Sequence, residues 1–240
     1  MNTMSASPSD ATAKQVAPRV LVWDAPVRVF HWLMVLCFAG AWLTAESERQ
    51  RLLHVTFGYG MVVLVAFRIL WGFIGSRYAR FSEFVRGPRA IVGYVAGLLR
   101  RAPEHFRGHN PAGAIAILAL LALAIVVPAA GLATYNDFGG HWVEEAHEIG
   151  ANLMLLVIAG HVAGVLLSSV LHRENLIGAM FSGRKPGNSS DAIPSARLGV
   201  AMLLIAAMLA LWTWQFLPSR GMTAASDSEV AAQAADADAD

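Results

Sequence analysis

Four of the eight histidines lie within or at the edge of long apolar runs, where ionisable side chains are costly and by default indicate function. His147 and His161 are fourteen residues apart in the stretch HEIGANLMLLVIAGH. On an α-helix this interval is about 40° short of four full turns, so both imidazoles project from nearly the same face, about 21 Å apart. His31 and His54 lie at the starts of two earlier apolar runs. Imidazole nitrogens ligate metal ions and haem iron, although a single buried histidine also serves as a hydrogen-bonded packing residue.

Membrane-spanning helices must position these histidines. The chain has 240 residues, of which 56% are hydrophobic and only 15% charged, against about a quarter charged in soluble domains. Five apolar runs account for the difference, each about 17–23 residues long and able to cross a hydrocarbon core of about 30 Å. They cover residues 29–45, 55–75, 112–133, 149–171 and 198–217. Residues 1–28 show no signal-peptide pattern, so the first run is expected to remain as a membrane anchor.

Positive charges predict the orientation of the spans, because cytoplasmic connections are enriched in Lys and Arg. Segments 1–28, 76–111 and 172–197 carry fourteen of these residues, whereas the alternate connections and the C-terminal tail carry three. The N-terminus is therefore predicted to be cytoplasmic and the C-terminus periplasmic. Within the second basic segment, PRAIVGYVAGLLRR at 88–101 is typical of a short helix at the membrane interface.

This orientation assigns a depth to each histidine. The first helix starts on the inner side, so His31 lies at the depth of His161 in the fourth helix. The second helix starts on the outer side, so His54 lies at the depth of His147. Two bis-histidine sites stacked across a helix bundle are what two b-type haems require. His172, eleven residues beyond His161 and on a similar face, is the weaker inner candidate because it lies in a polar connection.

Other residues of the spans fit haems that are held without covalent attachment. Cys37 is the only cysteine, which excludes an internal disulfide, a four-cysteine iron–sulfur cluster and the CxxCH motif of covalently attached haem. Arg68 is the only basic residue inside a span, and it is predicted either to neutralise a propionate of the inner haem or to snorkel to the headgroups. Glycines within a turn of the ligands either leave room for a flat macrocycle or serve ordinary helix contacts. These are Gly58, Gly150, Gly160 and Gly164.

The connections offer weaker signals. GHNP at 108–111 and YNDFGGHW at 135–142 border opposite surfaces and present polar and aromatic groups to a quinone, with no strong preference between them. His105, His109 and His141 lie in connections and need no role. The acidic, low-complexity tail ending AAQAADADAD is predicted to be disordered; it is solvated by default, and docking of a basic electron carrier is the alternative.

Several of these stretches together are similar to a known family. They are VWDAPVRVFHW at 22–32, RILWGFIGSRYARFSEF at 68–84, GHNPAGA at 108–114 and the HEIGAN…GHVAGV pattern at 147–165. Over about residues 20–185 the chain resembles the prokaryotic di-haem cytochrome b561 family, which is related to the b-type cytochrome subunits of membrane-bound nickel–iron hydrogenases. The resemblance implies a four-helix core in the bacterial inner membrane, with two b haems that exchange electrons with quinone. It also implies haem ligation at the positions that match His31, His54, His147 and His161.

The sequence thus predicts an all-α integral membrane protein, a four-helix haem-binding bundle with a fifth C-terminal span. Its expected parts are a flexible cytoplasmic N-terminus (1–20), a di-haem cytochrome b bundle (21–185), a linker and fifth span (186–217) and a disordered acidic periplasmic tail (218–240). The predicted function is electron transfer in a respiratory chain, between the quinone pool and a partner such as a periplasmic c-type cytochrome. Whether the chain is itself a quinone oxidoreductase stays open.

Two alternatives to this function remain. The first is the membrane-anchor cytochrome b subunit of a multi-subunit hydrogenase or dehydrogenase, with a redox enzyme subunit as partner. The second, with less support, is a histidine-dependent proton or metal transporter, although the five apolar runs contain no Asp or Glu. No nucleic-acid-binding motif and no hydrolytic constellation is present in the sequence.

Overall fold

The computed structural model describes residues 18–85, 87–100, 108 and 110–217. Within these residues five helices are long and apolar enough to cross a membrane: α1 (Ala25–Thr44), α2 (Arg51–Ile74), α5 (Pro111–Tyr135), α6 (His141–His172) and α8 (Leu198–Phe216). The predicted all-α membrane protein with five spans is confirmed. Residues 1–17 of the segment 1–20 that is predicted to be flexible, and the tail 218–240 that is predicted to be disordered, lie outside the described residues. The last two residues of the first segment, Arg19 and Val20, belong to a short strand.

The remaining elements are short. They are β1 (Arg19–Leu21), η1 (Glu48–Gln50), η2 (Arg77–Ala79), α3 (Phe81–Phe84), α4 (Pro88–Leu99), α7 (Leu176–Ser182), β2 (Arg184–Pro186) and η3 (Ser189–Asp191). The helix α4 occupies most of the stretch 88–101 that is predicted to form an interfacial helix.

The helix α6 is longer than the apolar run that predicts it. It begins at His141, eight residues before the run at 149–171, directly after Gly139 and Gly140, which both have positive φ. Hydropathy marks the part of a helix that lies in lipid, whereas helical hydrogen bonding continues through polar residues such as Glu144. His147 therefore lies well inside α6, with regular helix on both sides of it.

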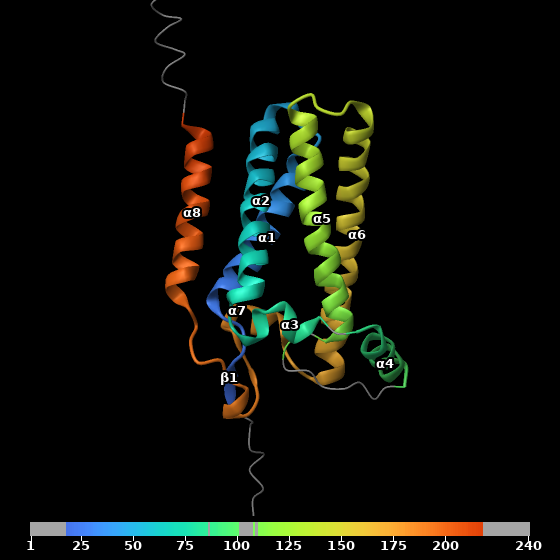
Figure 1. The fold of residues 1–240 in the computed structure, drawn as a ribbon, viewed down its shortest axis with the longest axis vertical. Helices are drawn as coiled ribbons and strands as arrows, with labels where there is room; N and C mark the ends of the chain where they lie inside the picture. Colours follow the sequence, from blue (N-terminus) through green and yellow to red (C-terminus); the bar gives the residue numbers. More distant parts are fainter. Residues whose placement is uncertain (1–17, 86, 101–107, 109, 218–240) are drawn as a thin grey trace, which may run out of the picture.

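Four of the spans, α1, α2, α5 and α6, stand side by side as a bundle (Figure 1). The helices α5 and α6 pack along each other, as do α1 and α2, and α2 also packs on α5. The fifth span, α8, lies outside the bundle against α1 and α2. The starts of α1, α5 and α8 lie at the same end as the ends of α2 and α6. We call it the basic end because the described parts of the Arg-rich segments 75–110 and 173–197 lie there. The opposite end holds the connections 45–50 and 136–140 and is called the acidic end.

Side-chain caps begin two of the spans at the basic end. The Asp24 carboxylate accepts a hydrogen bond from the Val27 amide (2.9 Å) at the start of α1, and Pro26 follows in the first turn. The Asn110 side chain accepts from the Gly113 amide (2.7 Å) at the start of α5, followed by Pro111. Both caps are expected at a helix N-terminus, where the first backbone amides have no acceptor within the helix. Proline suits the same position because it has no N–H that would need an acceptor.

A small sheet at the basic end joins the segment before α1 to the segment after α7. The strands β1 and β2 are antiparallel, with Val20 opposite Lys185. The carbonyl of Gly183 accepts from the amides of Val22 (2.8 Å) and Trp23 (3.0 Å). Gly183 has φ +75°, and a Cβ there would lie 2.6 Å from the Trp23 carbonyl oxygen, so only glycine fits this turn without strain.

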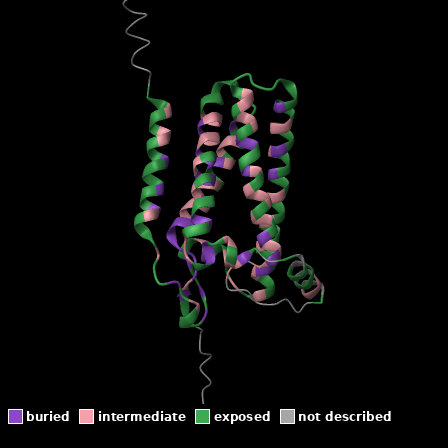
Figure 2. Ribbon diagram, in the orientation of Figure 1, coloured by how far each residue is buried: buried purple, intermediate pink, exposed green. Residues whose placement is uncertain are grey.

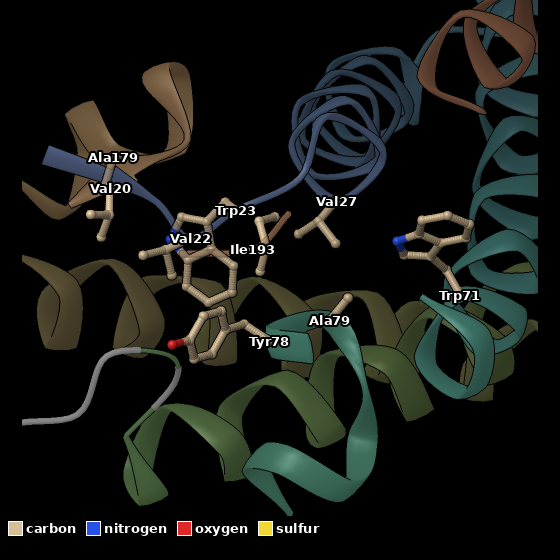
Figure 3. Close-up of a cluster of buried hydrophobic side chains, with 9 residues drawn as sticks. All are labelled: Val20, Val22, Trp23, Val27, Trp71, Tyr78, Ala79, Ala179 and Ile193. Atoms are coloured by element: carbon tan, nitrogen blue, oxygen red, sulfur yellow. The ribbon is translucent and has the colours of Figure 1, made fainter. Parts of the chain in front are cut away.

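A buried apolar cluster fixes this end of the bundle (Figure 3). Its members are Val20, Val22, Trp23, Val27, Trp71, Tyr78, Ala79, Ala179 and Ile193. They come from β1, α1, α2, η2, α7 and the segment before α8, so elements far apart in sequence share one core. Because Val27 is one turn before His31, the cluster also sets the position of the first histidine.

The spans carry few buried residues, as Figure 2 shows. Of the most apolar window of α6 only 6% is buried by the protein itself, compared with 39% for the second span. Large apolar side chains such as Leu153, Leu156 and Val170 are exposed on α6. This surface suits contact with lipid or with an apolar cofactor rather than with water.

Candidate cofactor site

His54 on α2 and His147 on α6 face each other near the acidic end. Their ring centroids are 6.0 Å apart and the ring planes are inclined by 77°. Both side chains are half-buried. Residues that are 93 positions apart in the sequence are thus brought into one site by the packing of α2 and α6 around α5.

A backbone carbonyl orients each of these imidazoles. Nδ1 of His54 lies 2.9 Å from the Ala41 carbonyl oxygen on α1, and Nδ1 of His147 lies 2.8 Å from the Val127 carbonyl oxygen on α5. A carbonyl can only accept a hydrogen bond, so Nδ1 carries the proton in both rings. Nε2 then has a free lone pair, which is the tautomer of a metal-ligating histidine.

The two acceptor carbonyls differ in their helical surroundings. Ala41 is in the last turn of α1, and the Ala45 amide donates to Trp42 (3.3 Å) rather than to Ala41. A helix end leaves carbonyls with spare accepting capacity, which the His54 imidazole uses. Val127 lies in the interior of α5, and the neighbouring Pro128 removes the helical donor of the carbonyl four residues earlier rather than that of Val127. The His147 imidazole therefore uses the second lone pair of an interior helix carbonyl.

Gly131 on α5 makes room for the ring of His147. A Cβ at Gly131 would lie 2.8 Å from Cε1 and 3.0 Å from Nδ1 of that ring, closer than side chains pack. The sequence alone singles out glycines near the ligands on their own helices and misses this one, because the third span carries no candidate ligand. A glycine in an apolar run was the only available signal.

His31 on α1 and His161 on α6 are the second pair that the sequence predicts, and both lie nearer the basic end. The helices α1 and α6 do not pack extensively on each other. Nδ1 of His31 is buried and has no hydrogen-bond partner within the described part of the chain. A buried polar atom without a hydrogen-bond partner lowers the stability of the fold, and a bound group could supply the missing partner.

An aromatic contact holds the His31 ring from one side. The Trp32 indole lies edge-on to it at 5.0 Å between centroids, and the same indole stacks on Phe181 of α7 at 4.3 Å. The Trp32 Nε1 also donates to the Met180 carbonyl (3.4 Å). The position of the ring is therefore coupled to α7 and to the basic-end cluster.

The glycines near the histidines divide into two kinds. A Cβ at Gly58, Gly160 or Gly164 would have no heavy atom within 4 Å, so these positions border open space. Gly150 instead lets α6 approach α5, since a Cβ there would lie 3.0 Å from Val127 Cγ2. The first three fit space for a macrocycle or lipid, and Gly150 serves the ordinary helix contact that is the alternative for all four.

Arg68 is buried near the basic end rather than extended towards the headgroups. Its side chain is only 3% exposed, and the guanidinium lies 5.1 Å from the Phe81 ring centroid and 5.9 Å from that of Phe84. Nη1 is buried without a hydrogen-bond partner within the described residues. The snorkelling alternative is therefore wrong, and a buried cation with an unpartnered donor among the described residues is left near the basic end.

Asp24 balances part of this charge and was not anticipated. It is fully buried, interacts electrostatically with Arg68, and accepts a hydrogen bond from Trp71 Nε1 (3.0 Å) in addition to capping α1. The sequence does contain a signal: Asp followed by Ala-Pro is typical of a helix start. It gives no sign that the same carboxylate would face a guanidinium 44 residues later.

The remaining histidines lie elsewhere. His172 is the last residue of α6 and lines a small cavity of about 40 Å³ with Asn110 and Glu174; His31 is not part of this lining. His141 is exposed at the start of α6. His105 and His109 lie outside the described residues.

The model of the family described as prokaryotic cytochrome b561 matches residues 22–183. The chain belongs to this family. A cytochrome of the b type carries haem b, so haem b is a cofactor of this membrane protein. The four histidines, Arg68, Asp24 and Gly131 all lie within the matched residues, whereas β2 and α8 follow them.

The curated relatives are cytochrome subunits. The chain is 25% identical to the probable Ni/Fe-hydrogenase 1 B-type cytochrome subunit of Escherichia coli K12, over 68% of this chain and 88% of the relative. It is 23% identical to the probable Ni/Fe-hydrogenase B-type cytochrome subunit of Rhizobium leguminosarum bv. viciae, over 74% and 94%. The corresponding protein of Azotobacter vinelandii is 24% identical over 71% and 89%. No solved structure matches the chain significantly.

Proposed function

We propose that this cytochrome b561 family member carries two haems and transfers electrons across the bacterial inner membrane, between the quinone pool and a redox partner at the periplasmic face. His54 and His147 would hold the haem near the acidic end, and His31 and His161 the haem near the basic end. The arrangement of His54 and His147 is the single observation that supports this proposal most directly.

Their spacing fits two imidazoles that would bind one iron ion. A metal–imidazole bond is about 2.0 Å long and the nitrogen is about 1 Å from its ring centroid, so two imidazoles that bind one metal ion can have centroids up to about 6 Å apart. The observed separation is 6.0 Å, and the Nδ1 protons on both rings leave Nε2 for the metal. Haem supplies one-electron chemistry when bound, by changing between ferric and ferrous iron.

The chain's own residues orient the ligands and balance charge. The Ala41 and Val127 carbonyls would strengthen the electron-donating character of the two imidazoles through their hydrogen bonds. Arg68 would pair with a haem propionate, because its buried Nη1 has no partner within the described residues and guanidinium suits a carboxylate. The open space at Gly160 and Gly164 lies on either side of His161 along α6.

The acidic end supports a positively charged partner such as a c-type cytochrome. Glu144, Glu145 and Glu148 are exposed on the first turns of α6, beside His147. The excess of Lys and Arg at the opposite end supports a cytoplasmic basic end and a periplasmic acidic end. Acidic groups around the point where electrons leave would steer a basic carrier to it.

The proposal includes electron exchange with a quinone, and each end of the bundle offers polar or aromatic groups to a quinone. At the basic end Asn110 is already engaged as the cap of α5, which leaves its amide nitrogen for other contacts. At the acidic end Tyr135 is half-exposed beneath Arg51, whose guanidinium is 5.6 Å from the ring centroid.

The names of the relatives favour a second candidate, the membrane-anchor cytochrome of a multi-subunit hydrogenase or dehydrogenase. In that case the acidic end would hold a permanent redox subunit rather than a diffusing carrier. Gentle purification from the native membrane distinguishes the two: a stoichiometric large redox subunit supports the anchor, and its absence together with quinol-dependent reduction supports the carrier.

The proposed function is tested by haem quantification on the purified full chain. We expect two non-covalent b haems per chain, extractable into acidic acetone, and two separate midpoint potentials in a redox titration. Reduction by a quinol should proceed without added protein. One haem per chain, or no reduction by any quinol, would contradict the di-haem electron-transfer proposal.

Replacing Gly131 with Ala should disturb only the haem near the acidic end. The added methyl would overlap the His147 ring and turn it away from the Val127 carbonyl, at a cost of about 1–3 kcal/mol. We expect a changed low-spin signal for one haem in electron paramagnetic resonance, with the other unaltered. Gly199→Ala on α8, where a Cβ meets no atom within 4 Å, is the matched control. An unchanged spectrum for Gly131→Ala would show that the ring position does not matter.

A further inference from the structure

A cavity of about 280 Å³ opens beside the small sheet at the basic end. It is lined by Arg19, Arg173, Glu174, Asn175, Arg184, Lys185 and Pro186. These residues come from β1, from the end of α6 and from β2, so the cavity exists only because the N-terminal strand pairs with the segment after α7. None of them is a candidate haem ligand.

The lining carries a surplus of positive charge. Lys185 and Glu174 form a buried ion pair at 3.1 Å and neutralise each other. Within the lining, the guanidinium groups of Arg19, Arg173 and Arg184 then remain as a surplus of three positive charges around one cavity. Three like charges so close together repel, and an anion is what such an arrangement stabilises.

The sheet itself holds two of these arginines in place. Arg19 donates to the Arg184 carbonyl and Arg184 to the Arg19 carbonyl, both at 3.3 Å. Each contact occupies one of the five N–H donors of a guanidinium, so further donors stay available to a ligand. Arg173, at the C-terminal cap of α6 with φ 51°, adds the third guanidinium from a different element.

Apolar side chains next to the cavity indicate its depth relative to the bilayer. Ile177 and Phe181 are 45% and 62% exposed on α7, the helix that begins directly after the lining residue Asn175. Phe181 stacks on Trp32, and aromatic rings of this kind gather where hydrocarbon meets headgroups. The cavity therefore lies at headgroup level, where phosphate groups of lipids are concentrated.

We propose that the cavity formed by Arg19, Arg173 and Arg184 is a binding site for a phosphate-bearing anion, supplied by the headgroup of an anionic phospholipid. Guanidinium groups recognise phosphate by paired hydrogen bonds as well as by charge. Basic recesses at the cytoplasmic ends of membrane helices bind such headgroups in general. The bound lipid would tie β1, β2 and the end of α6 together, and would stabilise the basic end independently of haem.

The test uses the purified full chain in a neutral detergent and measures thermal unfolding by far-ultraviolet circular dichroism. Phosphatidylglycerol, phosphatidylcholine and inorganic phosphate are titrated separately. We expect phosphatidylglycerol to raise the unfolding midpoint in a saturable way, and the other two to have little effect. The triple variant R19Q/R173Q/R184Q should weaken the apparent affinity for phosphatidylglycerol at least about tenfold, since each cation near an anionic surface contributes appreciably.

A matched variant removes the same charge from the same end. R80Q/R89Q/R100Q replaces three exposed arginines outside the cavity and should keep the wild-type affinity. If the triple variant of the cavity does not fold, Arg173→Gln alone is used, with about fivefold weaker binding expected. Wild-type affinity in the cavity variant would overturn the site, and equal stabilisation by inorganic phosphate would overturn the lipid as its source.

Discussion

Replacement of His147 by alanine is expected to reduce the haem content from two per chain to one. Without the imidazole, the iron near the acidic end would keep only His54 as a protein ligand, and a b haem has no covalent attachment to retain it. The remaining haem should keep its spectrum and midpoint potential. Pyridine haemochrome quantification and a redox titration of the purified variant measure both quantities.

The pairing of the histidines gives this experiment its controls. His54→Ala should remove the same haem as His147→Ala, and the double variant should lose no more than either single variant. His31→Ala and His161→Ala should remove the other haem. His141→Ala, exposed on the same helix, should retain both. Loss of different haems from the His54 and His147 variants would contradict the pairing, and loss of a haem from His172→Ala would restore the rival inner ligand.

Asp24→Ala is expected to cause the largest loss of stability, about 3–5 kcal/mol in the free energy of unfolding. The substitution removes the cap of α1 and the acceptor for Trp71 Nε1, and it leaves the buried Arg68 without the nearby carboxylate. The lost cap and the unsatisfied Trp71 N–H each cost about 1–3 kcal/mol, and the buried Arg68 keeps its charge out of water with less compensation. Unfolding in mixed detergent micelles, followed by circular dichroism, measures the loss.

Two further variants separate the contributions of Asp24. Asp24→Asn keeps a good helix cap and a hydrogen-bond acceptor while removing the charge, so its loss reports on Arg68. Asn175→Ala removes an exposed cap, in which Asn175 Oδ1 accepts from the Gly178 amide at 2.6 Å, and should cost only about 1 kcal/mol. If Asp24→Ala costs no more than Asn175→Ala, the carboxylate acts as a cap alone and not as the partner of Arg68.

The spans and the family follow from local features of the sequence. Apolar runs long enough to cross a bilayer predict the five helices, because hydropathy depends only on residue types within about twenty positions. The fourteen-residue interval between His147 and His161 is close to four helical turns, so it too places both residues on one face of α6 from local sequence alone. The helix bounds are less certain from sequence, and α6 extends through polar residues that hydropathy assigns to a connection.

The sequence by itself determined the helical membrane architecture, the set of candidate ligands and the excess of positive charge at one end. Only the tertiary structure decided that the ring centroids of His54 and His147 lie 6.0 Å apart, and that the Nδ1 atom of each ring is hydrogen-bonded to a backbone carbonyl of another helix. It also decided that Gly131 receives the His147 ring, that Arg68 is buried beside Asp24, and that β1 and β2 enclose a basic cavity. The reason is physical: helix formation depends on neighbours within a few residues, whereas the partner of a buried polar atom is whichever group the packing of distant segments brings within hydrogen-bond reach.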